Sequence, residues 1–266
     1  MSNSILDHDF ADGFLSDAAR NLRDTVHAEH GELVKLHYAS NRLAVGIQHL
    51  LDIHPERLQE TTAAALYARS LASTQGAVLL LEHGLPTQAK TVLRSALEAL
   101  FPLCAIEKKP ELASTILDTH DHDKRALVDK IRRWDSDVRA AIPFTDEELD
   151  VLAQGSGKEL KLYDVAKHAG MEQWYLVHYA LLSFSAHVKV STLDRHVVVV
   201  DQDRPIEFKN EPEIAGQYDA WMMATQVLLV AMRAVSNIFS LECDAIGKFG
   251  KRLIDLTQGP SLSDAK

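Results

Sequence analysis

The chain of 266 residues carries 38 Asp and Glu against 28 Lys and Arg, giving a formal net charge of −10 at pH 7. This balance excludes a global basic field for nucleic acid and disfavours lasting attachment to an anionic membrane, so any RNA contact requires a local basic patch. Hydrophobic residues make up 46% and charged residues 25% of the chain, as in a soluble globular protein.

Helical periodicity dominates the first half of the chain. Pro55 lies near a helix start, and Gly84 stands where that helix is expected to stop. A hinge is expected near Gly31, between the first two helices. The predicted helices are, in chain order, residues 10–30, 32–53, 55–84, 87–107 and 110–140.

The second half begins with a connector in which Thr145 caps a short acidic helix and GSG marks a loop. A short helix stopped at Gly170 and a longer one from Met171 to Val190 follow. The stretch HVVVVDQDRPIEF then predicts a β-hairpin, because a β-branched run and a turn-rich DQDRP precede a second extended piece. The last predicted helix covers residues 213–256 and bends near Gly247 and Gly250.

We therefore expect an all-α fold: a single multi-helix bundle with a small β-hairpin inserted near residues 195–208. Residues 1–256 form one helical domain in this interpretation, and residues 257–266 form a flexible C-terminal tail.

The longest apolar run, WMMATQVLLVAM, stops at Arg233 and is too short to span a membrane. The first residues are acidic and lack the apolar core of a signal peptide. Cys104 and Cys243 are the only cysteines, too few for a disulfide framework or a zinc ligand set. These observations predict a cytoplasmic location and no membrane partner.

The apolar stretch YALLSFSAHVK carries two serines and a histidine. Ser183 and His187 are four residues apart on a helix, so their side chains can meet and satisfy each other's hydrogen bonding. Because this helix is apolar nearly all round, we expect it to lie centrally in the bundle. Ser185 is expected to bond back to its own helix. The pair is either a structural hydrogen bond or part of a reactive site.

The stretch KTVLRSALEALFPLC places Arg94 and Glu98 four residues apart, opposite the apolar stripe of the same helix. One interpretation is an exposed ion pair that contributes roughly a few tenths of a kcal/mol. The other is that this face packs on the helix of Ser183 and His187, so that the four polar side chains form one network. Periodicity alone does not choose between them.

RSALEAL, followed much later by YALLSFSAH and the expected hairpin, resembles a bacterial helical family, the domain-of-unknown-function family 5677. That family carries an Arg-x-x-x-Glu helix and a later Ser-x-x-x-His helix, and Arg94, Glu98, Ser183 and His187 match these positions. The resemblance spans roughly residues 60–210 and brings no activity with it. It implies that the four residues belong together.

A looser likeness is to the HEPN helical ribonucleases and their abortive-infection relatives, which place an arginine and a histidine on one helix, usually across a dimer interface. Here Ser183 precedes His187 by four residues, and Arg94 can supply the charge only from another helix. The likeness implies a metal-independent ribonuclease in a defence or toxin context. His187 would be its general acid or base and Arg94 would hold a phosphate, while Glu98 or Ser183 orients the imidazole ring.

DTHDHDKR is a weaker candidate, for a metal site. His120 and His122 reach one metal with Asp118 or Asp123 only if the segment is a loop, and they diverge on a helix. A solvated helical segment is the favoured interpretation. The basic cluster that follows, with Trp134, could meet a phosphate and a base, although a solvated face is the commoner outcome.

HAEHGELVKLH places His27 and His30 three residues apart near Glu29, but the Glu-x-x-His pairs of a di-iron bundle are missing. No phosphate loop, dinucleotide fingerprint or nucleophile elbow is present in the sequence. We therefore expect no metal and no cofactor.

Two functions remain open: an interaction or regulatory module with an internal Arg/Glu/Ser/His network, or the HEPN-like ribonuclease. An enzyme requires Arg94 and His187 to face an open cleft, whereas a module requires the network to be closed and dry. The long Met-rich last helix also suits a homodimer interface. We expect a homo-oligomer, with RNA or protein as the candidate partner.

Overall fold

The computed structural model describes residues 13–154, 157, 160–186, 197–198, 207–208 and 212–258. The fold is all-α. Its helices are η1 (Gly13–Leu15), α1 (Asp17–Arg20), α2 (Arg23–Glu29), α3 (Gly31–Leu50), α4 (Leu58–Glu82), α5 (Pro86–Lys108), α6 (Leu112–Arg132), α7 (Ser136–Ala140), α8 (Asp146–Leu152), α9 (Leu162–His168), α10 (Glu172–Trp174), the π-helical turn η2 (Tyr175–Tyr179), α11 (Ala180–Ala186), α13 (Tyr218–Ile238) and α14 (Asp244–Gln258).

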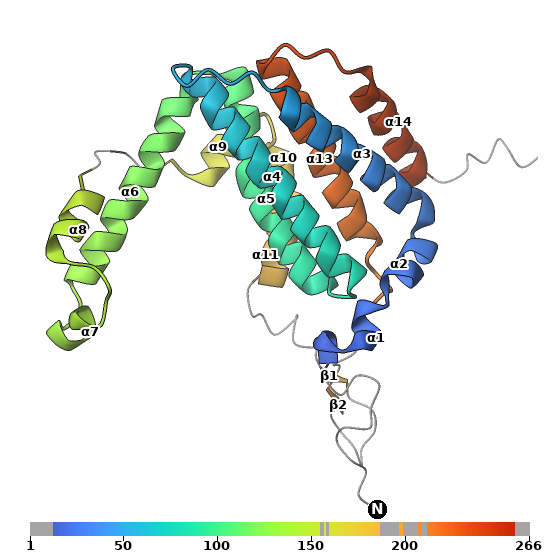
Figure 1. Cartoon of the computed structure of the whole chain (residues 1–266), viewed down its shortest axis with the longest axis horizontal. Coiled ribbons are helices and arrows are strands. Elements are labelled where there is room, and N and C mark those ends of the chain that lie inside the picture. Colours follow the sequence, from blue (N-terminus) through green and yellow to red (C-terminus); the bar gives the residue numbers. More distant parts are fainter. Residues whose placement is uncertain are drawn as a thin grey trace, which may run out of the picture.

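The centre of the bundle is the pair α4 and α5, which run side by side and are joined by a tight turn (Figure 1). Gly84 makes this turn with a φ of +71°, and a Cβ there would lie 2.4 Å from the Cβ of Pro212. Only glycine fits such a position, because it needs a left-handed backbone and a close approach. The predicted helix stop at Gly84 is confirmed.

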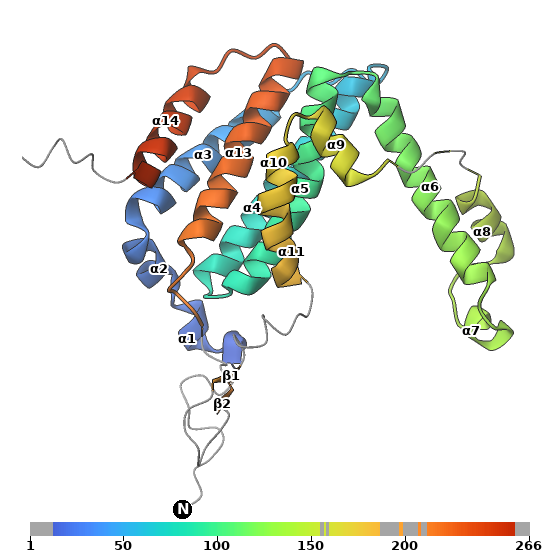
Figure 2. The ribbon, with the colours of Figure 1, turned by 180° about the vertical axis from the view of Figure 1, so that it is seen from behind.

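α13 packs against α3, α4 and α5, and α14 covers α3 and α13 (Figures 1 and 2). By length and composition α13 could cross a membrane, but 72% of its most apolar window is buried in the bundle. Burial of this extent is typical of the core helix of a soluble protein.

The predicted single helix over residues 213–256 is wrong. α13 ends at Ile238 and α14 begins at Asp244, while Gly247 and Gly250 lie inside α14. Ser240 adopts a left-handed φ of 54°, and the backbone N–H of Leu241 donates to the carbonyl of Ser236 at 2.8 Å. This is the Schellman helix stop, which normally carries glycine. α14 continues to Gln258, into the predicted tail.

The predicted helix over residues 110–140 is broken into α6 and α7. The N–H groups of Arg133 and Trp134 close a turn on Lys130 and Ile131, and Asp135 is extended with ψ at 151°. α6 leaves the main bundle and carries α7 and α8 at its far end (Figure 2). This arm (α6–α8) has a small core of its own, formed by Val128, Ile131 and Leu149.

The segment predicted as one helix over residues 10–30 contains three short ones, η1, α1 and α2, in its described part. Of the hairpin predicted near residues 195–208, two residue pairs are described. β1 (Val197–Val198) and β2 (Glu207–Phe208) pair antiparallel, with Val197 opposite Phe208. The residues between these strands lie outside the described part of the chain, and the assignment of residues 1–256 to one domain stays a prediction.

The apolar composition of the YALLSFSA helix predicts a central position, and this prediction is wrong. The helix packs on α5 from one side and exposes apolar side chains on the other. Leu176, Val177, Leu181 and Phe184 are exposed, and Leu182 is the one residue of α11 that is buried. The physical reason is that the pair α4 and α5, covered by α13, already fills the centre of the bundle. An apolar composition does not distinguish a core helix from the wall of a groove.

Candidate functional site

Nη2 of Arg94 lies 3.1 Å from Oε1 of Glu98, one turn further along α5. The two side chains share a third partner, Tyr179 of η2. Nη2 of Arg94 donates to the Tyr179 hydroxyl at 2.6 Å, and this hydroxyl donates to Oε1 of Glu98 at 2.9 Å. The Arg94 guanidinium also stands over the Tyr179 ring, 4.9 Å from its centre. We call these three residues the clamp, because they tie α5 to the neighbouring helix.

Aromatic contacts hold Tyr179 in place. Its ring stacks on Tyr175 with centres 5.0 Å apart, and Phe101 of α5 packs against both rings. Burial, together with the hydrogen bond to the Glu98 carboxylate, raises the pKa of Tyr179. Tyr179 therefore remains a neutral phenol that can donate and accept at once, as the clamp requires.

The structure brings Arg94 and Glu98 together, but it gives Ser183 another role. The Ser183 hydroxyl donates to the backbone carbonyl of Tyr179 at 2.7 Å, the bond back to its own helix that we expected of Ser185. His187 lies outside the described residues, so its pairing with Ser183 stays a prediction. Tyr179 was missed in the sequence, although it continues the four-residue spacing of Ser183 and His187 backwards along the helix.

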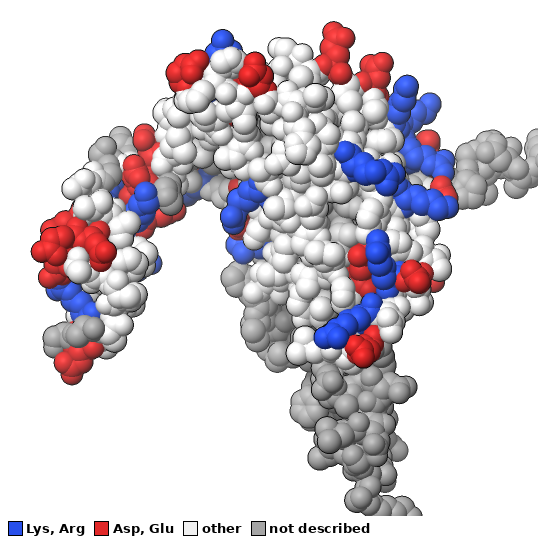
Figure 3. All heavy atoms as spheres, in the orientation of Figure 1, with Lys and Arg blue, Asp and Glu red and all other residues white. Residues whose placement is uncertain are grey.

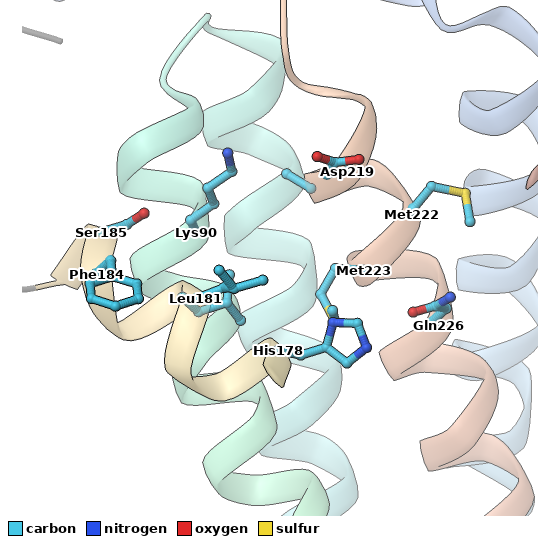
Figure 4. A pocket seen from close by; sticks show the side chains of 11 residues that line it. Lys90, His178, Leu181, Phe184, Ser185, Asp219, Met222, Met223 and Gln226 are labelled. Carbon is cyan, nitrogen blue, oxygen red and sulfur yellow. The ribbon is translucent and has the colours of Figure 1, made fainter. Parts of the chain in front are cut away.

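Beside the clamp lies a groove of about 600 Å³ between α5, the η2–α11 helix and α13 (Figure 4). On both the η2–α11 wall and the α13 wall, the lining residues include a set with the helical spacing i, i+3, i+4 and i+7, so one face of each helix borders the groove. The lining residues are Lys90, His178, Leu181, Leu182, Phe184, Ser185, Asp219, Ala220, Met222, Met223 and Gln226.

The groove is apolar in the middle and polar at its two ends. In Figure 4, His178 reaches across towards Met223 and Gln226, while Lys90 and Asp219 stand at the opposite end. Burial lowers the pKa of His178, which favours the neutral imidazole, able to donate from one nitrogen and accept at the other. This arrangement can bind an apolar body and hydrogen-bond to a polar group at each end.

A second polar cluster surrounds Glu82, the last residue of α4, which is only 3% exposed. Its Oε1 atom accepts hydrogen bonds from Tyr38 at 2.5 Å, His27 at 2.6 Å and Arg23 at 3.2 Å. Burial alone would raise the pKa of Glu82, but the bonds from Tyr38 and His27 and the charge of Arg23 outweigh it. The pKa therefore lies below its usual value.

Behind this cluster the core contains a buried histidine. Nδ1 of His37 lies 3.1 Å from the hydroxyl of Thr225, and its ring packs edge-on against Trp221. Burial lowers the pKa of His37 to about 4, so this imidazole is neutral at physiological pH. Glu82 and His37 were not recognised in the sequence, because both stand in helices whose spacing indicates only core or surface.

The candidate metal segment and the basic cluster after it both lie on the arm (α6–α8). His122 lies in α6, as the solvated-helix interpretation predicts, and the side chain of His120 is not described. Among the described residues, no group of three or more His, Cys, Asp or Glu is placed to hold a metal ion. In the basic cluster, Arg132 pairs with Asp150 of α8, and Arg125 donates to the carbonyl of Gly157.

These features define a class: an all-α bundle in which a polar clamp fixes one wall of an apolar groove. The chain belongs to a family of unknown function, DUF5677, which it matches over residues 60–205, more than half of its length. We found no match to the chain among curated proteins or among solved structures. The looser likeness to HEPN proteins has no support from these comparisons.

Proposed function

We propose that this protein is a binding module, and that its ligand is a small molecule with an apolar body and a hydrogen-bonding group at each end. The observation that carries the proposal is the groove between α5, α11 and α13. Its volume of about 600 Å³ lies within the range of small-molecule sites. A protein does not usually leave apolar side chains exposed around a hollow unless something binds there.

The lining supports this ligand chemistry. Met222 and Met223 are nearly buried and form an apolar floor, while Leu181 stands exposed at the rim. Methionine is flexible and polarisable, so such a floor adapts to different apolar shapes. His178 and Gln226 then supply hydrogen bonds at one end of the ligand.

In this proposal the clamp positions the wall of the groove and does not react. The Arg94 guanidinium is engaged by Tyr179 and Glu98, which leaves it poorly placed to hold a phosphate. His187, the other residue of the ribonuclease alternative, lies outside the described part of the chain, and its role is tested by the RNA experiment below. The polar residues of α5 and η2 therefore support the interaction module over the enzyme.

The test is a titration with N-phenyl-1-naphthylamine, a neutral dye that fluoresces in apolar sites. We compare Leu181→Lys with Leu79→Lys, because both leucines are 59% exposed on helices and only Leu181 lines the groove. Leu181→Lys is expected to weaken dye binding about tenfold, from the loss of roughly 1.5 kcal/mol of apolar contact. Leu79→Lys should bind the dye as the wild type does.

Equal binding by the two variants, or no saturable binding by the wild type, would contradict the proposal. In parallel, wild type and His187→Ala are incubated with total RNA in EDTA. Cleavage that disappears in a folded His187→Ala variant would replace the binding module with the ribonuclease.

Cytoplasmic location and self-association also belong to the proposal. The free thiols of Cys104 and Cys243 suit a reducing compartment. The exposed apolar residues Leu176 and Val177 on η2 offer a contact surface for a second copy of the chain. Analytical ultracentrifugation tests this: we expect the wild type to sediment as a dimer and Val177→Lys to dissociate. A monomeric wild type would contradict the proposed homodimer.

A further inference from the structure

A second cavity, of about 250 Å³, opens at the surface of α2 and α3, away from the groove. Its lining contains two arginines, one lysine, one histidine, one tyrosine and one valine, and no carboxylate. The lining residues are Arg23, His27, Val34, Lys35, Tyr38 and Arg42. In a chain with a net charge of −10 such a concentration of positive charge needs a reason.

The buried carboxylate of Glu82 organises the inner side of this cavity. Its Oε1 atom fixes Nε of Arg23 and the hydroxyl of Tyr38, and Nη2 of Arg23 donates to that same hydroxyl at 3.3 Å. One edge of the guanidinium is thereby used. No described residue engages Nη1 of Arg23, so donors remain for a ligand, and the guanidinium is already held in a fixed orientation.

The outer side of the cavity carries two more cations. Nζ of Lys35 lies 3.1 Å from Oε1 of Glu32, and both side chains are exposed. The other oxygen of Glu32 lies 2.9 Å from Nη2 of Arg252 on α14. Exposed pairs of this kind are weak and are easily exchanged for a stronger anion. Arg42 has no ion-pair or hydrogen-bond partner among the described residues. Figure 3 shows Lys and Arg side chains gathered over α3 and α14.

We propose that this cavity binds the terminal phosphate of a small molecule, held by Arg23, Lys35 and Arg42. A phosphate presents several charged oxygens, so it can accept from donors on different sides at once. Arginine donors in a fixed orientation match that geometry better than a single lysine does. The buried Glu82 balances part of the positive charge in the empty cavity, which lets the cations stay close together before the ligand arrives.

This site is independent of the proposed groove. The first half of α13 separates the two: Trp221 packs edge-on against His27 on the cavity side, with ring centres 6.5 Å apart, while its neighbours Ala220 and Met222 line the groove. No residue lines both sites. A failure of one proposal therefore leaves the other standing.

The test is isothermal titration calorimetry at constant ionic strength, with inorganic phosphate, glycerol 3-phosphate and glycerol as separate ligands. Arg42→Gln is compared with Arg69→Gln, because both arginines are exposed on long helices and only Arg42 lines the cavity. We expect both phosphates to bind and glycerol not to bind. Arg42→Gln should weaken phosphate binding about tenfold or more, and Arg69→Gln should leave it unchanged.

Tighter binding of glycerol 3-phosphate than of inorganic phosphate would identify a phosphorylated small molecule as the source, and the reverse would identify the free ion. The proposal is overturned if wild type binds neither phosphate, or if Arg42→Gln and Arg69→Gln bind alike. Binding of a short single-stranded RNA that depends on Arg42, without binding of either phosphate, would assign the surface to nucleic acid instead.

Discussion

Glu82→Gln is the sharpest test of how the polar clusters contribute to stability. The substitution keeps the shape and an acceptor oxygen but removes the charge that Tyr38, His27 and Arg23 share. Hydrogen bonds to an ionised group are roughly twice as strong as neutral ones, so each bond loses about 1 kcal/mol. Arg23 is 57% exposed at its side chain and contributes less because water screens it. We expect a total loss of about 2 kcal/mol in the free energy of unfolding.

The assay is urea and thermal unfolding followed by far-ultraviolet circular dichroism. For a chain of this length, about 2 kcal/mol lowers Tm by roughly 4–8 °C. Glu29→Gln is the matched control, because Glu29 is an exposed glutamate on α2, the helix that carries Arg23 and His27. It should change the free energy by less than about 0.5 kcal/mol. If Glu82→Gln is as stable as Glu29→Gln, the buried charge contributes nothing and the reasoning is refuted.

The same substitution makes a prediction about pH. The pKa of Glu82 in the folded protein lies below its usual value, so the folded state releases this proton more readily than the unfolded state does. The stabilisation is therefore complete above the unfolded pKa, about 4.3, and disappears as pH falls through the folded pKa. The difference between wild type and Glu82→Gln should shrink as the solution is acidified below pH 4.3 or so. A difference that grows on acidification would contradict the assigned direction.

Two further predictions concern the clamp and the arm. Tyr179→Phe should cost about 1 kcal/mol in urea unfolding, because its hydroxyl joins Arg94 and Glu98, whereas Ser183→Ala should cost about 0.5 kcal/mol or less. A larger cost for Ser183→Ala would restore the serine to the centre of the network. Val128→Ala removes roughly 1.5 kcal/mol of burial from the small core of the arm, so hydrogen exchange in α8 should accelerate about tenfold. Equal acceleration in α4 would show that the arm and the bundle unfold together.

Helix punctuation with a strong local signal was predictable from the sequence. The proline before α4, the glycine after it and the periodicity of α5 gave boundaries within a few residues of those in the structure. Arg94 and Glu98 were paired correctly because four-residue spacing on one helix fixes their distance without any tertiary information. Spacing within one helix does not predict contacts between helices, so Tyr179, the third member of the clamp, was not found.

The errors have physical causes at particular residues. Ser240 ends α13 in a left-handed conformation that usually requires glycine, so the sequence pattern does not reveal the break between α13 and α14. Gly247 and Gly250 suggested a bend, but both lie inside α14. Glu82 ends an apolar run and looks like a surface residue at a helix end. Its burial is caused by Arg23, His27 and Tyr38, which arrive from helices 44 to 59 residues away in sequence.

The range matched by the family model covers only part of each proposed binding site. Residues 60–205 contain the clamp and two walls of the groove, formed by α5 and η2–α11. The third wall is α13, outside the matched range, and it supplies Met222, Met223 and Gln226. The cavity of Arg23, Lys35 and Arg42 also lies outside it, except for Glu82, which orients Arg23 from within. The matched region therefore contains the whole clamp, whereas both proposed binding sites also use helices outside that region: α13 for the groove, and α2 and α3 for the cavity.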